Sequence, residues 1–93
     1  MIRSFRHKGL RDFFDSGSLA GVNHRHTDKL TRILSALDRA LGPDDVRHPT
    51  FRLHPLKGAR KGTWSVTVAA NWRVTFAFDK SNDVVEVDYE DYH

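Results

Sequence analysis

The chain has 93 residues, a net charge of +3 and 39% hydrophobic residues, and it contains no cysteine. This length fits one domain covering residues 1–93, and the ordinary apolar content argues against intrinsic disorder. The lack of cysteine excludes disulfide bonds and cysteine-ligated zinc. No signal peptide is recognisable and no stretch approaches the ~20 apolar residues of a membrane span, so we expect a cytoplasmic protein without membrane contact.

Charge is distributed unevenly along the sequence. Residues 46–78 contain no Asp or Glu but hold six Lys and Arg residues, whereas the last fifteen residues are rich in Asp and Glu. A basic middle segment indicates binding to a polyanion such as nucleic acid. A solvated basic face would give the same pattern, so charge alone leaves both interpretations open.

The first half of the chain predicts a short strand over residues 2–5 and two helices. Leu10, Phe13 and Phe14 have helical spacing, which predicts a helix over residues 8–16 that stops at Gly17. A second helix is expected over residues 24–41, with Asn23 as N-cap and Thr27 as the competing cap. Gly and Pro at positions 42 and 43 should end it, and residues 43–47 can form one further turn. The expected buried stripe of the second helix consists of Leu30, Ile33, Leu34, Leu37, Ala40 and Leu41.

From residue 51 the hydrophobic pattern changes from helical to alternating. Pro55 disfavours helical angles at His54, so residues 53–56 should be extended, followed by a polar turn over residues 57–62. Alternation predicts half-buried strands over residues 63–68 and 72–78, joined as an antiparallel hairpin. After a turn at residues 80–83, Val85, Val87 and Tyr89 mark a last strand. These elements predict an α+β fold in which two N-terminal helices pack on one face of a small antiparallel sheet.

The alternation also predicts which side chains share a sheet face. Because the side-chain period of a strand is two, Arg73 must face away from the helices if Trp72 faces them. Ser65, Thr67 and Thr75 should lie on the same open face as Arg73, which makes a plausible phosphate site. The side chains expected to face the helices are Trp64, Val66, Val68, Trp72, Val74, Phe76 and Phe78.

The chain has residues suited to cutting RNA without a metal ion. A base can take the proton of the 2′-hydroxyl, an acid can protonate the leaving 5′-oxygen, and cations can stabilise the phosphoryl oxygens. Of six histidines, His54 stands out because it precedes Pro55 and lies three residues before Lys57 in the segment without acidic residues. The i, i+2 spacing of His24 and His26 does not place them on one helical face, so we interpret both as structural or solvated. No carboxylate or histidine group has metal-ligand spacing, so we expect no metal and no cofactor.

Five blocks of sequence occur in a fixed order along nearly the whole chain. They are residues 1–10 (MIRSFRHKGL), 53–58 (LHPLKG), 62–66 (GTWSV), 70–76 (ANWRVTF) and 88–93 (DYEDYH). Taken together, these blocks resemble the HigB toxins of the RelE superfamily. The length and the Asp-Tyr-His at residues 91–93 match as well, and the order and spacing of the blocks make the resemblance specific.

The resemblance implies a fold, an activity and partners. HigB toxins have a microbial-RNase-like (RelE-like) α+β fold, and they cut messenger RNA in the A site of the 70S ribosome, on its small subunit, without a metal. A HigA-like helix-turn-helix antitoxin neutralises them, and the pair represses its own promoter, so the toxin contacts operator DNA indirectly through the antitoxin. We therefore expect a ribosome-dependent messenger RNA endonuclease that inhibits translation and growth.

The resemblance also implies roles for individual residues. The family's catalytic positions correspond to His54, Asp91, Tyr92 and His93, with the two histidines in proton transfer and the choice of acid and base open. Lys57 and Arg73 correspond to residues that hold or neutralise phosphate. Further phosphate or RNA contacts are expected from Asn71, Arg60 and Lys61.

Other functions compete with this expectation. Relatives often carry a basic residue where this chain has Ala69, which would leave one contact fewer to phosphate or ribosome. A catalytically weak or inactive module that binds antitoxin, operator complex or ribosome is therefore the main alternative. A repressor that blocks translation sterically comes next, and a metal-dependent nuclease comes last.

Overall fold

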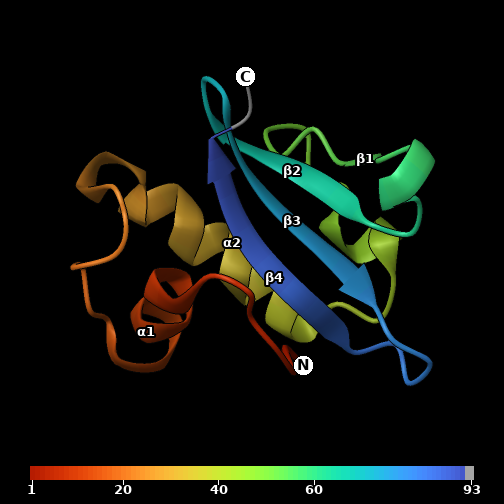
Figure 1. Ribbon diagram of the computed structural model, residues 1–93, viewed down its shortest axis with the longest axis horizontal. Coiled ribbons are helices and arrows are strands. Elements are labelled where there is room, and N and C mark those ends of the chain that lie inside the picture. The colour runs from red at the N-terminus through yellow and green to blue at the C-terminus, as the bar shows by residue number, and fades with distance from the viewer. Residues whose placement is uncertain (92–93) are drawn as a thin grey trace.

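Two α-helices precede a four-stranded antiparallel sheet in the computed structural model, which describes residues 1–91; Tyr92 and His93 lie outside the described residues. Figure 1 shows the helices α1 (Lys8–Ser16) and α2 (Thr27–Arg39) and the strands β1 (His54–Pro55), β2 (Trp64–Ala69), β3 (Trp72–Phe78) and β4 (Val84–Asp91). Short 3-10 helices η1 (His24–His26), η2 (Pro43–Val46) and η3 (Gly58–Arg60) lie between them. The strand order is β1-β2-β3-β4, which confirms the expected α+β class. In residues 1–91 no helix has the length and apolar content needed to cross a bilayer.

Helix α1 has the expected bounds because both of its ends are capped. The Nδ1 atom of His7 accepts a hydrogen bond from the backbone N–H of Leu10 at 2.9 Å, which satisfies one of the free donors of the first turn. At the other end Gly17 adopts a left-handed conformation with φ of 75°, and its N–H donates to the Phe13 carbonyl at 2.9 Å.

The helix expected over residues 24–41 is wrong at both ends. Asn23 does act as an N-cap, but for η1, where its side chain accepts from the N–H of Arg25 at 2.9 Å; α2 begins only at Thr27. It ends at Arg39 because Ala40 turns to an extended conformation with ψ of 138°. Leu41 is therefore 70% exposed, whereas the other members of the expected stripe are buried.

The segment of residues 2–5 is not a strand as expected, but it runs along β4. Ile2 and Phe5 form isolated parallel bridges with Val84 and Val87. The backbone N–H of Arg3 donates to the Val84 carbonyl at 2.7 Å. Figure 1 shows this first segment of the chain beside β4.

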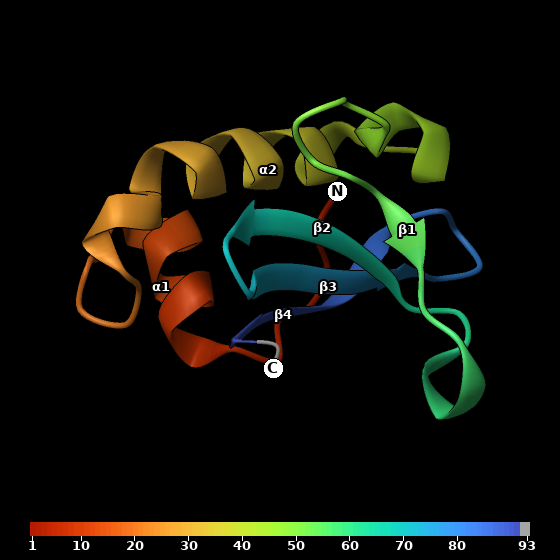
Figure 2. The same ribbon diagram turned by 90° about the horizontal axis from the view of Figure 1, so that it is seen from above.

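The core lies between α2 and one face of the sheet. Figure 2 shows α2 across that face, with α1 beside it near the turn between β2 and β3. Of the side chains expected to face the helices, Val66, Val68, Val74 and Phe76 are buried. The larger side chains of Trp64, Trp72 and Phe78 are only partly buried, and they pack against the edge of this core.

A bulge in β4 changes the face that its first residues present. Glu86 has a positive φ of 59°, and the register with β3 shifts between Thr75 and Ala77. Because an extra residue reverses the alternation, Val84 is fully buried before the bulge and Val85 is not. The expected last strand exists, but the role given to Val85 belongs to Val84. Beyond the bulge, Asp88 and Glu90 share the open face of the sheet, since they alternate with the buried Tyr89.

Candidate active site

The face of the sheet turned away from α2 carries two rows of polar side chains. Cross-strand neighbours lie on the same face of an antiparallel sheet, so the strand register defines these rows. The first row crosses all four strands and contains His54, Ser65, Thr75 and Asp88. The second row crosses β2, β3 and β4 and contains Thr67, Arg73 and Glu90.

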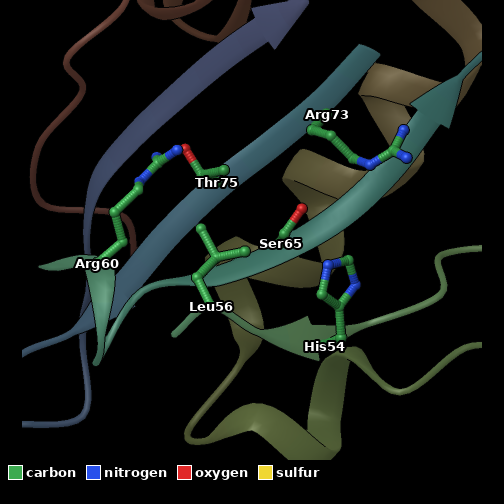
Figure 3. Close-up of a pocket in the computed structure, with 6 residues that line it drawn as sticks. All are labelled: His54, Leu56, Arg60, Ser65, Arg73 and Thr75. Carbon is green, nitrogen blue, oxygen red and sulfur yellow. The ribbon is translucent and has the colours of Figure 1, made fainter. Parts of the chain in front are cut away.

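A small pocket opens on this face. Ser65 and Thr75 are buried at its base, whereas His54 is exposed at one side and Arg73 borders it from β3, with its side chain extending across β2. This is the placement that the strand alternation predicts for Arg73, Ser65 and Thr75. As Figure 3 shows, the lining residues are His54, Leu56, Arg60, Ser65, Arg73 and Thr75.

His54 is oriented by a contact with the backbone. Its Nδ1 lies 3.1 Å from the carbonyl oxygen of Arg52, a residue with a positive φ of 50°. A carbonyl oxygen can only accept, so this contact favours a proton on Nδ1. The Nε2 atom is then the ring nitrogen with a lone pair, and it can accept a proton from a substrate.

Arg73 is held against the turn between β2 and β3. Its Nη1 donates to the carbonyl oxygen of Ala70 at 2.8 Å and to that of Trp72 at 3.2 Å. Asn71 lies exposed in the same turn. A guanidinium fixed in this way offers its other N–H groups to a phosphate with little loss of side-chain freedom.

Arg60 and Glu90 form a bidentate ion pair at the pocket. Nη1 and Nη2 of Arg60 donate to the two carboxylate oxygens of Glu90 at 3.1 and 2.7 Å, and the Thr75 hydroxyl donates to the same carboxylate at 2.6 Å. These hydrogen bonds, led by that from Arg60, lower the pKa of Glu90 although partial burial opposes the shift. Glu90 is therefore ionised near neutral pH, and Arg60, expected to bind RNA, has a carboxylate partner.

The sequence reasoning missed Glu90. The segment without Asp or Glu suggested a purely cationic site, but β4 brings this carboxylate back to it from a distance of 30 residues in sequence. Its position two residues after Asp88 and one before Asp91 made it look like part of a solvated acidic tail. The one available signal was the strand alternation, which places Glu90 opposite Arg73 once the register is known.

The remaining expected site residues surround the pocket without lining it. Lys57 and Lys61 are exposed on either side of η3 and border a neighbouring hollow with Leu56 and Trp64. Asp91 is exposed at the end of β4, opposite Trp72. The expected roles of Tyr92 and His93 concern positions outside the described residues.

His26 belongs to the packing between the helices and the sheet. His26 is 7% exposed, and its Nδ1 lies 2.5 Å from the hydroxyl of Tyr89. Burial lowers the pKa of His26 and raises that of Tyr89, so both are neutral at pH 7. Among residues 1–91, no three His, Cys, Asp or Glu side chains are grouped so that they could hold a metal ion.

Two comparisons with known proteins agree. A sequence profile described as the RelE-like toxin of type II toxin-antitoxin system HigB matches residues 3–93. The chain is also 45% identical over 93 residues to a protein of Proteus vulgaris named Endoribonuclease HigB, and the match covers 100% of both sequences. The chain therefore belongs to the family of HigB-like toxins of type II toxin-antitoxin systems.

Proposed function

We propose that this chain is a toxin that cuts messenger RNA on the ribosome and thereby inhibits translation and growth. Membership in the HigB-like family and the endoribonuclease name of the Proteus vulgaris relative support the activity. The two helices and the antiparallel sheet are consistent with the RelE-like, microbial-RNase-like fold. The observation that carries the proposal is the pocket that His54 from β1 and Arg73 from β3 both line, beside the strand that contains Asp91.

The cleavage is an attack within the RNA. The Nε2 atom of His54 takes the proton of the 2′-hydroxyl, whose oxygen forms a bond to the neighbouring phosphorus. The bond from phosphorus to the 5′-oxygen breaks, and an acid from the segment of Asp91, Tyr92 and His93 protonates that oxygen. Arg73, with Lys57, Lys61 and Asn71 nearby, neutralises the charge that develops on the phosphate. No metal or cofactor takes part in this proposal.

The partners follow from the family. A type II toxin has a protein antitoxin, and we propose a HigA-like helix-turn-helix protein, which would also carry the toxin to operator DNA. The substrate is messenger RNA in the A site of the 70S ribosome, where the small subunit holds the codon. The exposed cations Lys57 and Lys61 suit contacts to phosphates of messenger or ribosomal RNA.

The decisive experiment is cleavage of one messenger RNA by the purified chain with and without programmed ribosomes, with a chelator selective for transition metals in all tubes and Mg²⁺ kept at the level that intact ribosomes need. We expect cuts within codons only when ribosomes are present. Cuts in naked RNA at a comparable rate would show a free ribonuclease, and dependence on added divalent cations for chemistry would contradict the metal-free mechanism. The absence of cuts in both tubes would favour the binding-module alternative, with Ala69 as the first residue to test by replacement with arginine.

His54→Ala and His48→Ala form a matched pair for this assay. His48 is also exposed, but its Nδ1 lies 2.8 Å from the Thr50 hydroxyl and its ring packs against Phe51, away from the pocket. Loss of a general base reduces a rate about 10²- to 10⁴-fold. We therefore expect that loss for His54→Ala, and wild-type cleavage for His48→Ala.

A further inference from the structure

We propose that Glu90 is a positioning residue of the active site, which acts by holding Arg60 and thereby fixes the two sides of the pocket against each other. The inference rests on the proposed ribonuclease function for its kinetic test, but its structural part does not. Glu90 would touch no reacting atom. Its role is to join the segment that carries His54 and Lys57 to the strand that leads into Asp91.

The geometry joins three elements at one carboxylate. Arg60 belongs to η3, Thr75 to β3 and Glu90 to β4, and all three bonds to the carboxylate are between 2.6 and 3.1 Å. Figure 3 shows the Arg60 side chain extended over the sheet towards Thr75. A two-pronged ion pair fixes direction as well as distance, so it defines the position of η3 over the open face.

The segment that needs this support bonds mostly to itself. The N–H of Leu56 donates to the Thr63 carbonyl at 2.9 Å, and the N–H of Thr63 donates to the Arg60 carbonyl at 3.0 Å. Strand β1 pairs with β2 over only two residues, His54 and Pro55. Figure 2 shows η3 on the side of the sheet away from α2, so the helices do not brace it. The bond from Arg60 to Glu90 thus ties this segment to the far strand of the sheet.

The carboxylate is poorly suited to the chemistry itself. It is ionised and accepts from both Arg60 and Thr75, so it holds no proton to give to a leaving group. A carboxylate beside a phosphate pocket would also repel the substrate, unless a cation neutralised it. Its arrangement with Arg60 therefore fits positioning better than proton transfer.

The first test compares Glu90→Gln with Asp83→Asn. Asp83 accepts from Nε of Arg3 at 2.8 Å, and its side chain is 17% exposed against 24% for Glu90, so the two changes remove similar partly buried ion pairs near opposite ends of β4. On programmed ribosomes, we expect Glu90→Gln to lower the cleavage rate at saturating protein about 10- to 100-fold, as misplacement of catalytic groups does. The protein concentration that gives half of the maximal rate should change little. Asp83→Asn should cut at the wild-type rate.

Three results would overturn the proposal. If Glu90→Gln cleaved at the wild-type rate, Glu90 would have no positioning role. If it cleaved faster, Glu90 would only repel RNA. Equal slowing by Asp83→Asn would show a general effect of stability. A double-mutant cycle gives a fourth criterion. If Glu90 acts through Arg60, the double variant Arg60→Ala, Glu90→Ala should cleave no more slowly than the slower of the two single variants. A double variant in which the two losses of rate add would contradict the link.

Hydrogen exchange separates this proposal from the proposed function. In Glu90→Gln the amides of Leu56, Lys61 and Thr63 should exchange faster while global unfolding stays near that of Asp83→Asn. This measurement needs no RNA or ribosome. If the wild-type chain did not cut RNA, faster exchange in Glu90→Gln would leave the structural link standing while the ribonuclease function was rejected. Unchanged exchange would reject the link.

Discussion

At the scale of single residues, His54 depends on one backbone oxygen for its orientation. The contact of Nδ1 with Arg52 leaves the lone pair on Nε2, and in the proposed mechanism His54 acts as the base, so a second group must supply the proton to the leaving oxygen. The family resemblance points to His93 for this step. We expect His93→Ala to abolish cleavage and to leave the thermal unfolding midpoint unchanged, with both measured on the same preparation. A folded His93→Ala protein with full activity would move the acid to Asp91 or Tyr92.

Tyr89 makes a contact whose loss should appear in stability. Tyr89→Phe removes the hydroxyl that partners Nδ1 of buried His26. A buried polar group left without a partner costs about 1–3 kcal/mol, so the free energy of unfolding in denaturant should fall by that amount. Because Tyr89 faces the helices, cleavage below the unfolding transition should remain. A stability equal to that of the wild type would show that water replaces the hydroxyl.

Residues whose position follows from local sequence could be placed correctly, and residues whose position depends on distant partners could not. The proline after His54 and the strand alternation around Arg73 are local, and both predicted side chains line the pocket. Glu90 meets Arg60 across 30 residues, and no spacing in the sequence encodes that meeting. His26 was expected to be structural or solvated; it is buried because Tyr89 from the last strand covers it.

At the scale of elements, α1 approaches the segment before η1 through two glycines. A Cβ atom on Gly9 would lie 2.6 Å from the Gly21 carbonyl oxygen, closer than atoms can pack. Gly9→Ala must therefore push α1 away from this segment, and overpacking of this kind costs about 1–3 kcal/mol. Gly42→Ala is the matched control, since its φ is −178° and nothing lies within 4 Å of the added carbon. Thermal unfolding should separate the two variants, and equal midpoints would contradict the close approach.

Most helices and strands could be predicted from the sequence. The errors occur where the backbone conformation of a single residue ends a helix or shifts a strand. Apolar spacing gave α1 and the β2–β3 hairpin, because each has one buried face. Helix α2 ends before Ala40, which is extended although it is not a helix-breaking residue, and Leu41 is exposed as a result. Glu86 introduced a bulge that exchanged the roles of Val84 and Val85. Neither the helix end at Ala40 nor the bulge at Glu86 could be predicted from residue type, because alanine favours helices and a glutamate with positive φ is rare.

At the scale of the whole molecule, stability should fall as the solution is acidified, and in two stages. Burial lowers the pKa of folded His26, so the unfolded chain binds a proton first, and stability is lost from about pH 6.5 downwards until the folded pKa is reached. The ion pairs lower the pKa values of Glu90 and Asp83. Their stabilisation is present above the unfolded values of about 4 and is lost as pH falls through the folded ones.

Unfolding midpoints measured from pH 8 to pH 3 would test this sequence of events. His26→Asn should remove most of the first stage and leave the second in place. Glu90→Gln should reduce only the second stage. If His26→Asn still lost as much stability as the wild type in the first stage, that loss would come from the exposed histidines instead.

The parallel bridges of Ile2 and Phe5 to β4 bear on how the toxin behaves when it accumulates. They cover part of the outer edge of an eight-residue strand, while the opposite edge of the sheet is a strand of only two residues. Unpaired strand edges recruit other chains into aggregates. A toxin released from its antitoxin would therefore meet other copies of itself without offering them a long strand to join, and we expect it to stay dispersed. Loss of residues 1–5 would uncover β4 and should favour self-association over diffusion.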